Sequence, residues 1–206
     1  MPQFTTPTEL LALTALLAYL AGSIPFGLVF ARLFGLGDLR KIGSGNIGAT
    51  NVLRTGSKPA AFLTLVLDAG KGGIAVLIAR ALLADDAAQI AGLFAFLGHL
   101  FPIYLRFQGG KGVATFLGTA LALSFPLGLA CCATWAVTAL IFRYSSLAAL
   151  VSAVSSPIWA IVVDYRTSVL LCVLLAQLIF LRHRSNIERL FARTEPKIGQ
   201  KKPPSA

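Results

Sequence analysis

Long apolar segments, interrupted by short polar loops, occupy most of this 206-residue chain. Hydrophobic residues make up 56% of the sequence and charged residues only 13%, and the mean hydropathy is +0.78. A soluble domain of this size could not hide so much apolar surface from water, whereas a lipid bilayer accepts it. The sequence therefore predicts an integral membrane protein.

The charge balance is strongly basic, because 18 Lys and Arg face 8 Asp and Glu, for a formal net charge of +10. Such an excess usually lies where anionic lipid or an anionic ligand can meet it. A nucleic-acid-binding protein would show the same balance, but it would not spend most of its length in apolar runs. The composition therefore argues against nucleic acid as a partner.

Most of the apolar runs approach the ~20 residues that a helix needs to cross the hydrocarbon core. The first has no basic segment before it and is too long for the apolar part of a signal peptide, so we expect it to be retained as a helix. The predicted spans cover residues 9–34, 59–83, 87–105, 113–123, 126–142, 146–163 and 167–181, each to within a few residues.

One apolar run, from Val113 to Phe142, contains Pro126 and could be one kinked helix or two short ones. Short loops rich in Lys and Arg stay in the cytoplasm. A single span here would export the basic C-terminal tail, whereas two spans keep it inside together with Arg143. The tail residues concerned are Arg182, Arg184, Arg189, Arg193, Lys197, Lys201 and Lys202.

The expected fold is an all-α integral membrane protein with seven transmembrane helices and glycine-rich cytoplasmic loops. Its N-terminus lies outside and its C-terminus inside. Residues 1–206 form one domain, and residues 184–206 form a basic cytoplasmic tail. The span at 113–123 is too short for a full crossing at ~1.5 Å per residue, so we expect a re-entrant loop at 109–112.

The sequence predicts neither a metal site nor a cofactor. Cys131, Cys132 and Cys172 lie in apolar segments without metal-ligand spacing, so we expect them to be small buried hydrophobic residues. No cluster of His, Cys or carboxylate residues has the spacing of metal ligands.

A glycine-rich loop at residues 43–51 reads GSGNIGATN, and Arg54 follows it. Glycines let successive backbone amides converge on an anion, and Ser, Thr and Asn side chains add donors. The G-x-x-x-x-G spacing matches a P-loop, but Ala49 and Thr50 stand where that motif needs Lys and then Ser or Thr. The loop indicates a phosphate site without a nucleoside triphosphate; an ordinary surface loop is the alternative.

A second loop, at residues 106–115, reads RFQGGKGVAT and places Lys111 among glycines directly before a helix. The N-terminus of a helix favours anions, and Lys111 would add a full charge. Two such loops on one face, together with Arg54, indicate an anion site more strongly than either alone. Arg106 and Lys111 could instead act only as topology signals.

Two further pairs of polar residues accompany these loops. Asp68 and Lys71 can face each other on a helix, either as a structural ion pair or as the wall of a polar cavity, because charges in a bilayer must be paired or hydrated. His183 and Asn186 could point together into the site from the end of the last span, although a basic helix cap would look similar. We interpret His99 as a hydrogen-bonded histidine at a helix end.

Four motifs, in this order, resemble the bacterial PlsY family of acyl-phosphate-dependent glycerol-3-phosphate acyltransferases. They are SGNIGATN (44–51), LDAGKG (67–72), GGKGVAT (109–115) and SN (185–186). The resemblance spans nearly the whole chain. It implies a seven-helix enzyme of the bacterial inner membrane, active at the cytoplasmic face, that transfers an acyl group from acyl phosphate to the C1 hydroxyl of glycerol 3-phosphate. The products would be lysophosphatidic acid and phosphate, in phospholipid biosynthesis, with a functional link to an acyl-phosphate-producing enzyme.

On this resemblance, both substrates bring a phosphate to the glycine-rich loops. The expected acyl-phosphate site consists of Ser44, Gly45, Asn46, Gly48 and Thr50. The expected glycerol 3-phosphate site consists of Arg54, Lys111, His183 and Asn186, supported by Asp68, Lys71, Gly109, Gly110 and Gly112.

The sequence contains no evident Ser-His-Asp set or paired carboxylates, so we assign no covalent intermediate. An acyl phosphate is already activated, and positioning, charge stabilisation and a substrate phosphate acting as base can suffice. The main alternative is a transporter or channel for an organic phosphate. The polar motifs gather at one face and no inverted repeat is evident, which argues against transport.

Overall fold

The structure is a computed structural model that describes residues 4–199, and every regular element in that range is helical. Residues 200–206, which include Lys201 and Lys202 of the predicted tail, lie outside the described part of the chain. The elements are α1 (Thr8–Gly22), α2 (Phe26–Leu33), η1 (Leu39–Lys41), α3 (Ala49–Leu53), α4 (Lys58–Leu82), α5 (Asp85–Leu100), η2 (Ile103–Leu105), α6 (Val113–Leu123), α7 (Phe125–Phe142), α8 (Ser145–Val162), η3 (Arg166–Ser168), α9 (Val169–Arg182) and α10 (Arg184–Phe191).

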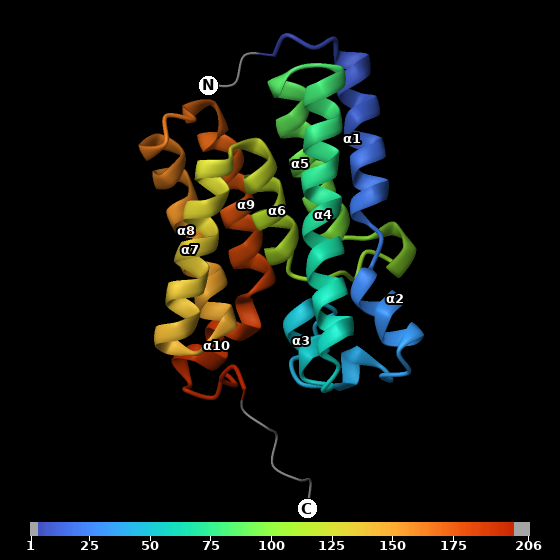
Figure 1. Cartoon of the computed structure of the whole chain (residues 1–206), viewed down its shortest axis with the longest axis vertical. Helices are drawn as coiled ribbons and strands as arrows, with labels where there is room; N and C mark the ends of the chain where they lie inside the picture. The colour runs from blue at the N-terminus through green and yellow to red at the C-terminus, as the bar shows by residue number, and fades with distance from the viewer. Residues whose placement is uncertain (1–3, 200–206) are drawn as a thin grey trace, which may run out of the picture.

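The long helices form two groups that run along the long axis of the molecule (Figure 1). In one group α5 packs against α1 and α4, and in the other α8 packs against α7 and α9. Helix α6 joins them, because it contacts both α4 and α7. The short helices α3 and α10 lie at the lower end in Figure 1, opposite the start of α1.

Five helical segments of the described chain are long and apolar enough to cross a membrane. A sixth candidate span, Arg166–Arg182, continues into Arg184–Phe191 with a bend of 64°. The predicted multi-helix membrane fold is therefore confirmed, and α6, with 11 residues, is the short segment that the sequence indicated. Seven crossings and their orientation stay a prediction.

The first predicted span, 9–34, is not one continuous helix. It is divided into α1 and α2 by Ser23, Ile24 and Pro25. Proline has no amide hydrogen and restricts the residue before it to extended conformations, so a helix ends ahead of it. Lys71 of α4 donates a hydrogen bond of 2.9 Å to the carbonyl of Ile24, at the break itself.

The run that could have been one kinked helix is two helices, α6 and α7, with Ser124 between them in an extended conformation. Arg80 of α4 donates to the carbonyls of Ala122 and Leu123, at 2.7 and 2.9 Å, and so stabilises the C-terminal end of α6. At its other end α6 begins at mid-height in Figure 1, after the loop that follows η2. The re-entrant loop before α6 stays a prediction.

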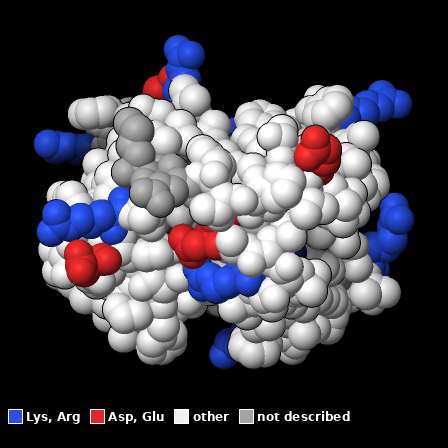
Figure 2. Space-filling view, turned by 90° about the horizontal axis from the view of Figure 1, so that it is seen from above, with Lys and Arg blue, Asp and Glu red and all other residues white. Residues whose placement is uncertain are grey.

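Charged groups are distributed unequally between the two ends of the bundle. Figure 2 looks onto the end that carries the start of α1 and the turn between α4 and α5, and shows a mostly uncharged surface with charged groups mainly towards its rim. In the described chain, the basic residues there are Arg80 and Arg166, which pair with Asp85 and Asp164 at 2.8 and 3.3 Å. The other end is formed by α2, α3, the start of α4, the turn between α7 and α8, and α10 (Figure 1). These segments and the loops next to them carry Arg32, Arg40, Lys41, Arg54, Lys58, Arg143, Arg184, Arg189, Arg193 and Lys197.

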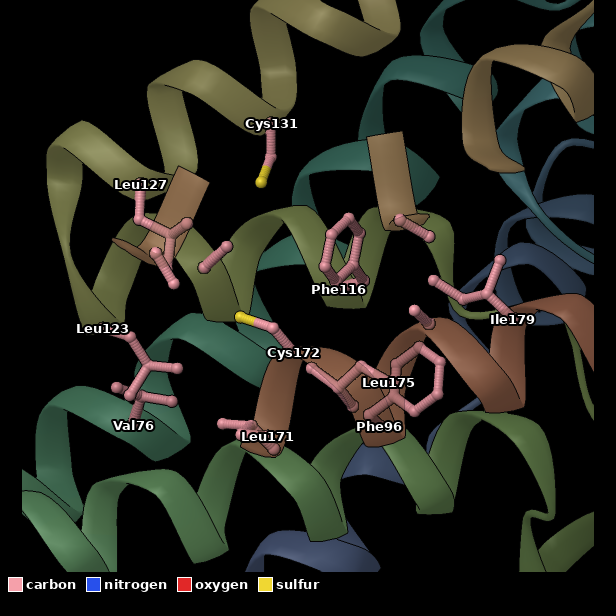
Figure 3. Packing of buried hydrophobic residues seen from close by; sticks show 14 of the residues in the cluster. Val76, Phe96, Phe116, Leu123, Leu127, Cys131, Leu171, Cys172, Leu175 and Ile179 are labelled. Carbon is pink, nitrogen blue, oxygen red and sulfur yellow. The ribbon is translucent and has the colours of Figure 1, made fainter. Parts of the chain in front are cut away.

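The main apolar core lies where α5, α6, α7, α8 and α9 meet, and Val76 of α4 completes it (Figure 3). Phe96 and Phe116 are its largest members, and both are almost fully buried. Cys131 and Cys172 are buried in the same cluster, as the sequence predicted, whereas Cys132 is half-buried and lines a cavity. Many other large apolar side chains are exposed, which suits a surface solvated by lipid rather than water.

Candidate active site

A cavity of about 620 Å³ lies between α3 and α4 on one side and α6, α7, α8 and α10 on the other. Charged and hydroxyl side chains line one part of it, and apolar side chains of α4, α6 and α7 line the rest. Most of the predicted site residues are brought together here: Ser44, Asn46, Gly48, Thr50, Arg54, Asp68, Lys111, Gly112, His183 and Asn186. Gly45, Lys71, Gly109 and Gly110 do not line the cavity and lie behind its wall.

The first glycine-rich loop is held by Asn51, which is buried beneath it. The Asn51 side chain donates to the carbonyl of Leu39 at 2.9 Å and accepts from the amide of Ser44 at 3.1 Å. In the described chain, the backbone amides of residues 46–50 donate to no other protein group. The loop thus presents a run of amide donors next to the hydroxyl groups of Ser44 and Thr50, as an anion site requires.

Several helices begin at the cavity. Ala49 of α3, Lys58 of α4, Val113 of α6 and Ser145 of α8 are all first residues of their helices, and all line it. The unsatisfied amides at a helix N-terminus carry a partial positive charge. These helix N-termini therefore favour negative charge in the cavity, in addition to the effect of its cationic side chains.

Lys111 crosses the cavity to α10, where its Nζ donates a hydrogen bond to Oδ1 of Asn186. Burial lowers the pKa of Lys111 to about 8. The positive charge of the nearby Arg189 adds to this effect, and the negative charge of Glu195 opposes it. Burial also lowers the pKa of Arg54, against the effect of Glu195. Positive charge is thus concentrated here beyond what the protein itself neutralises.

Glu195, in the segment after α10, is a site residue that the sequence analysis missed. Its carboxylate accepts hydrogen bonds from Ser146 at 2.7 Å, Asn186 at 2.6 Å and Arg189 at 2.7 Å. Burial would raise the pKa of Glu195, but these hydrogen bonds outweigh it and the pKa is lowered. Glu195 therefore stays ionised and fixes the amide of Asn186, whose oxygen faces Lys111.

His183 is neutral at physiological pH, because burial lowers its pKa to about 4. Its Nδ1 lies 2.8 Å from the carbonyl of Ile179. A carbonyl can only accept, so Nδ1 carries the ring proton and Nε2 is left as an acceptor. A neutral acceptor of this kind suits a substrate hydroxyl rather than a phosphate.

The second glycine-rich loop is clamped by its own neighbours. The amides of Gly109 and Gly110 donate to the carbonyls of Leu100 and His99, both at 3.1 Å. Their carbonyls accept from Arg182 at 2.8 and 3.1 Å. These two glycines therefore do not offer free amides to an anion; they hold Lys111 in place.

Other residues that line the cavity were not assigned to the site beforehand. His99 was interpreted as a helix-end histidine, yet it lines the cavity next to Asp68. Ser145 lies 3.3 Å from Thr50, hydroxyl to hydroxyl. The sequence could have indicated Ser145, because it follows Arg143 in a turn that was predicted to lie on the cytoplasmic side, where the site was expected. Among residues 4–199, no group of three or more His, Cys, Asp or Glu side chains could hold a metal ion.

The helical fold and this cavity, part cationic and part apolar, define an integral membrane protein whose cavity is suited to an anionic ligand. A model of the glycerol-3-phosphate acyltransferase family matches residues 12–193. The chain belongs to this family, and it is therefore a membrane acyltransferase of the PlsY type, in phospholipid synthesis.

Relatives and solved structures agree with this membership. A glycerol-3-phosphate acyltransferase of Jannaschia sp. is 67% identical over 200 residues, covering 97% of this chain and 98% of the relative. One of Dinoroseobacter shibae is 64% identical over 202 residues, covering 98% and 100%. The crystal structure of the integral membrane glycerol 3-phosphate acyltransferase PlsY, in its glycerol 3-phosphate form, is 40% identical and covers 92% of this chain and 96% of its own, with a TM-score of 0.87.

Proposed function

We propose that the protein transfers an acyl group from acyl phosphate to the C1 hydroxyl of glycerol 3-phosphate, giving lysophosphatidic acid and phosphate. The observation that carries the proposal is one cavity that joins a cationic part, built from loop amides, helix N-termini, Arg54 and Lys111, to an apolar wall. Two phosphates fit the first part and a fatty acyl chain fits the second. This pairing is what the reaction requires of a single site.

The phosphate of the acyl donor is assigned to the first glycine-rich loop. The hydroxyl groups of Ser44 and Thr50, the Asn46 side chain and the free amides around Gly48 face the cavity. Gly45 contributes through the loop conformation, because its φ is +70° and its amide donates to Ile42. Donors aimed at the leaving phosphate would stabilise the charge that develops on it.

Glycerol 3-phosphate is assigned to Arg54, Lys111, His183 and Asn186. The protein neutralises the positive charges of Arg54 and Lys111 only in part, which suits a small dianion. Such a ligand has little apolar surface, so charged hydrogen bonds must bind it. The neutral His183 and the amide of Asn186 would orient the glycerol hydroxyl groups. Asp68, Lys71 and the glycines at residues 109–112 support the loop that carries Lys111.

The acyl chain is assigned to the apolar wall and to a groove that continues it. Phe62, Leu65 and Trp135 line the apolar part of the main cavity. An apolar groove of about 410 Å³ adjoins it along α4 and α6, with Ala69, Gly118 and Leu121 common to both. From Phe62 to Leu77, α4 advances about 22 Å at 1.5 Å per residue, enough for a long acyl chain.

The chemistry needs no covalent enzyme intermediate. The C1 oxygen forms a bond to the acyl carbon, the bond from that carbon to the phosphate oxygen breaks, and the hydroxyl proton passes to the leaving phosphate. Protons therefore balance without a protein base. Positioning of the two substrates and neutralisation of the phosphates supply the rate enhancement.

The orientation that we propose places α3, α10 and the cavity in the cytoplasm and the N-terminus outside. Basic residues are concentrated at that end of the bundle, and the opposite end has Arg80 and Arg166 in the described chain, both paired with carboxylates. Positive charge in short loops marks the cytoplasmic side. In a bacterial inner membrane, a cytoplasmic site would receive acyl phosphate from the enzyme that makes it.

The test uses purified full-length protein in detergent with palmitoyl phosphate and labelled glycerol 3-phosphate. We expect lysophosphatidic acid and inorganic phosphate in equal amounts, and no product when a thioester donor replaces the acyl phosphate. Equal turnover with an acyl thioester would overturn the proposed donor. Absence of product with both donors, from protein that remains folded, would overturn the acyl transfer itself.

A further inference from the structure

Three ionisable side chains form a buried cluster at the back of the cavity, within the membrane-spanning part of the fold. Asp68 and Lys71 lie on α4 and His99 lies on α5, with exposed fractions of 2%, 8% and 5%. Lys71 Nζ is 2.8 Å from Asp68 Oδ1, and His99 Nδ1 is 3.6 Å from the same oxygen. The reaction as balanced above uses none of the three as acid or base.

The cluster contacts two backbone segments next to Lys111, the first turn of α6 and the loop at Gly110. The Asp68 carbonyl accepts from Thr115, in the first turn of α6, at 2.8 Å. The His99 carbonyl accepts from the amide of Gly110 at 3.1 Å, and the His99 ring packs so closely on Gly110 that a Cβ there would overlap Nε2. The residue after Gly110 is Lys111.

The geometry of His99 speaks against a direct catalytic role. One edge of its ring faces Asp68 and the other edge faces the Cα of Gly110. Neither nitrogen is therefore directed at a hydroxyl in the open cavity. The ring instead fills the space that the missing side chain of Gly110 leaves.

Stability alone is a weak reason for such a cluster. A buried ion pair contributes little net free energy, because desolvation of the two charges offsets their attraction, whereas apolar residues of similar size would pack at least as well. The charged groups instead fix the orientation of their side chains. Lys71 must also reach the carbonyl of Ile24 at the break between α1 and α2, and Asp68 must face both Lys71 and His99.

We infer that Asp68, Lys71 and His99 are positioning residues that hold the loop of Gly109 and Gly110 at the depth where Lys111 meets Asn186. They thereby set the affinity for the anionic acceptor. The inference rests on the proposed function in one respect, the assignment of Lys111 to glycerol 3-phosphate. It deepens it by giving the physical reason why Asp68 and Lys71 support that loop, and by adding His99, to which the proposed acceptor site assigns no task.

The test measures the Kd of labelled glycerol 3-phosphate by equilibrium dialysis on full-length protein in detergent, so that it does not depend on turnover. The variants are His99→Gln, Lys111→Ala and the two combined. If His99 acts through Lys111, His99→Gln alone should weaken binding about tenfold, and should change the Kd less than twofold once Lys111 is already Ala. The KM for acyl phosphate should stay within about twofold in His99→Gln.

Two further variants separate positioning from folding. The charge-neutral pair Asp68→Asn with Lys71→Met leaves no buried unpaired charge, and should weaken glycerol 3-phosphate binding as His99→Gln does. Ser152→Ala removes a buried hydrogen bond of 2.8 Å from Ser152 of α8 to the carbonyl of Cys131 on α7. Neither residue lines the cavity, so this variant should leave that Kd unchanged. It controls for a general loss of helix packing.

The possible outcomes are distinct. Equal weakening by His99→Gln with and without Lys111, or a Kd of the charge-neutral pair equal to that of the parent protein, would overturn the inference. A parent-like Kd in Lys111→Ala, with a weakened Kd in His99→Gln, would overturn the assignment of Lys111 in the proposed function and the inference with it. Of these two ways to overturn the inference, the first leaves the proposed function intact and the second does not.

Discussion

Lys111 and Asn186 are 75 residues apart in the chain, yet the ammonium group of one donates to the amide oxygen of the other across the cavity. Lys111 comes from the clamped loop before α6, and Asn186 is held in turn by Glu195. The cation is therefore fixed from two sides by groups from different parts of the chain. This arrangement makes Lys111 the sharpest point at which to test the proposed acceptor site.

Lys111→Ala and Arg54→Ala should each weaken the use of glycerol 3-phosphate by ten- to a hundredfold. Each removes one charge-assisted hydrogen bond to the phosphate, worth ~1.5 to 3 kcal/mol. The measurement is kcat/KM for glycerol 3-phosphate at saturating acyl phosphate. The matched control is the pair Lys201→Ala and Lys202→Ala in the tail, which should change it little; an equal loss there would mean that the basic residues serve bulk membrane electrostatics.

Gly48→Val should raise the KM for acyl phosphate or abolish activity in protein that still folds. A Cβ at Gly48 would lie 3.1 Å from the side-chain nitrogen of Asn46, so a branched side chain would displace Asn46 and cover the free amides of the loop. Steady-state kinetics in which the concentration of each substrate is varied in turn give the KM for acyl phosphate. An unchanged KM for the donor would show that the loop is only a connector.

The sequence predicted the helices well wherever an apolar run has a clear chemical boundary. The break at Ser124 and the end of α7 near Arg143 are examples, because Pro126 and a charge mark them. The division of α1 from α2 was missed, since Pro25 stands in an uninterrupted apolar run. The partner of the Ile24 carbonyl at this break, Lys71, comes from α4 and is distant in sequence. Helix α10 was missed because its eight residues, RSNIERLF, contain no long apolar run.

The residues of the candidate site could also be predicted only where a local signal in the sequence marks them. Glycines, a lysine and an arginine in short loops are local signals, so Ser44, Arg54 and Lys111 could be chosen from their motifs. Glu195 and His99 could not, because each gains its role from partners distant in sequence: Glu195 from Ser146, and His99 from Asp68.

Gly70→Phe should shift the acyl preference of the enzyme toward shorter chains. Gly70 lines the apolar groove beside α6, and a Cβ there meets no atom closer than 3.9 Å, so the ring would fill the groove rather than unfold the helix. The rate with a series of acyl phosphates of increasing length gives the profile. Val66→Phe adds the same ring to an exposed position of α4 outside both cavities, and should leave the profile unchanged. Identical profiles for the two variants would remove the groove from the acyl path.

Reporter fusions should place residue 5 outside the cytoplasm and residue 200 inside it. An odd number of crossings keeps the basic end of the bundle, with α3 and α10, at the cytoplasmic face. Labelling of single cysteines introduced at the same two positions gives an independent measurement. A C-terminus found outside would exclude seven spans, and α6 would then have to be part of a segment that does not cross.

The pH dependence of acceptor use should report the charge of Lys111. Burial and neighbouring arginines lower its pKa to about 8, so in the free enzyme the ammonium group loses its proton as the pH rises past 8. The substrate phosphate is already a dianion there, since its second pKa is about 6. Bound phosphate favours the charged lysine, and kcat/KM follows the free enzyme, so kcat/KM for glycerol 3-phosphate should fall by up to about tenfold per pH unit above 8. Lys111→Arg keeps its charge in this range, and its profile should be flat between pH 7.5 and about 9.5. If the parent protein and Lys111→Arg lose activity in parallel, another group titrates and the charge of Lys111 does not control acceptor binding.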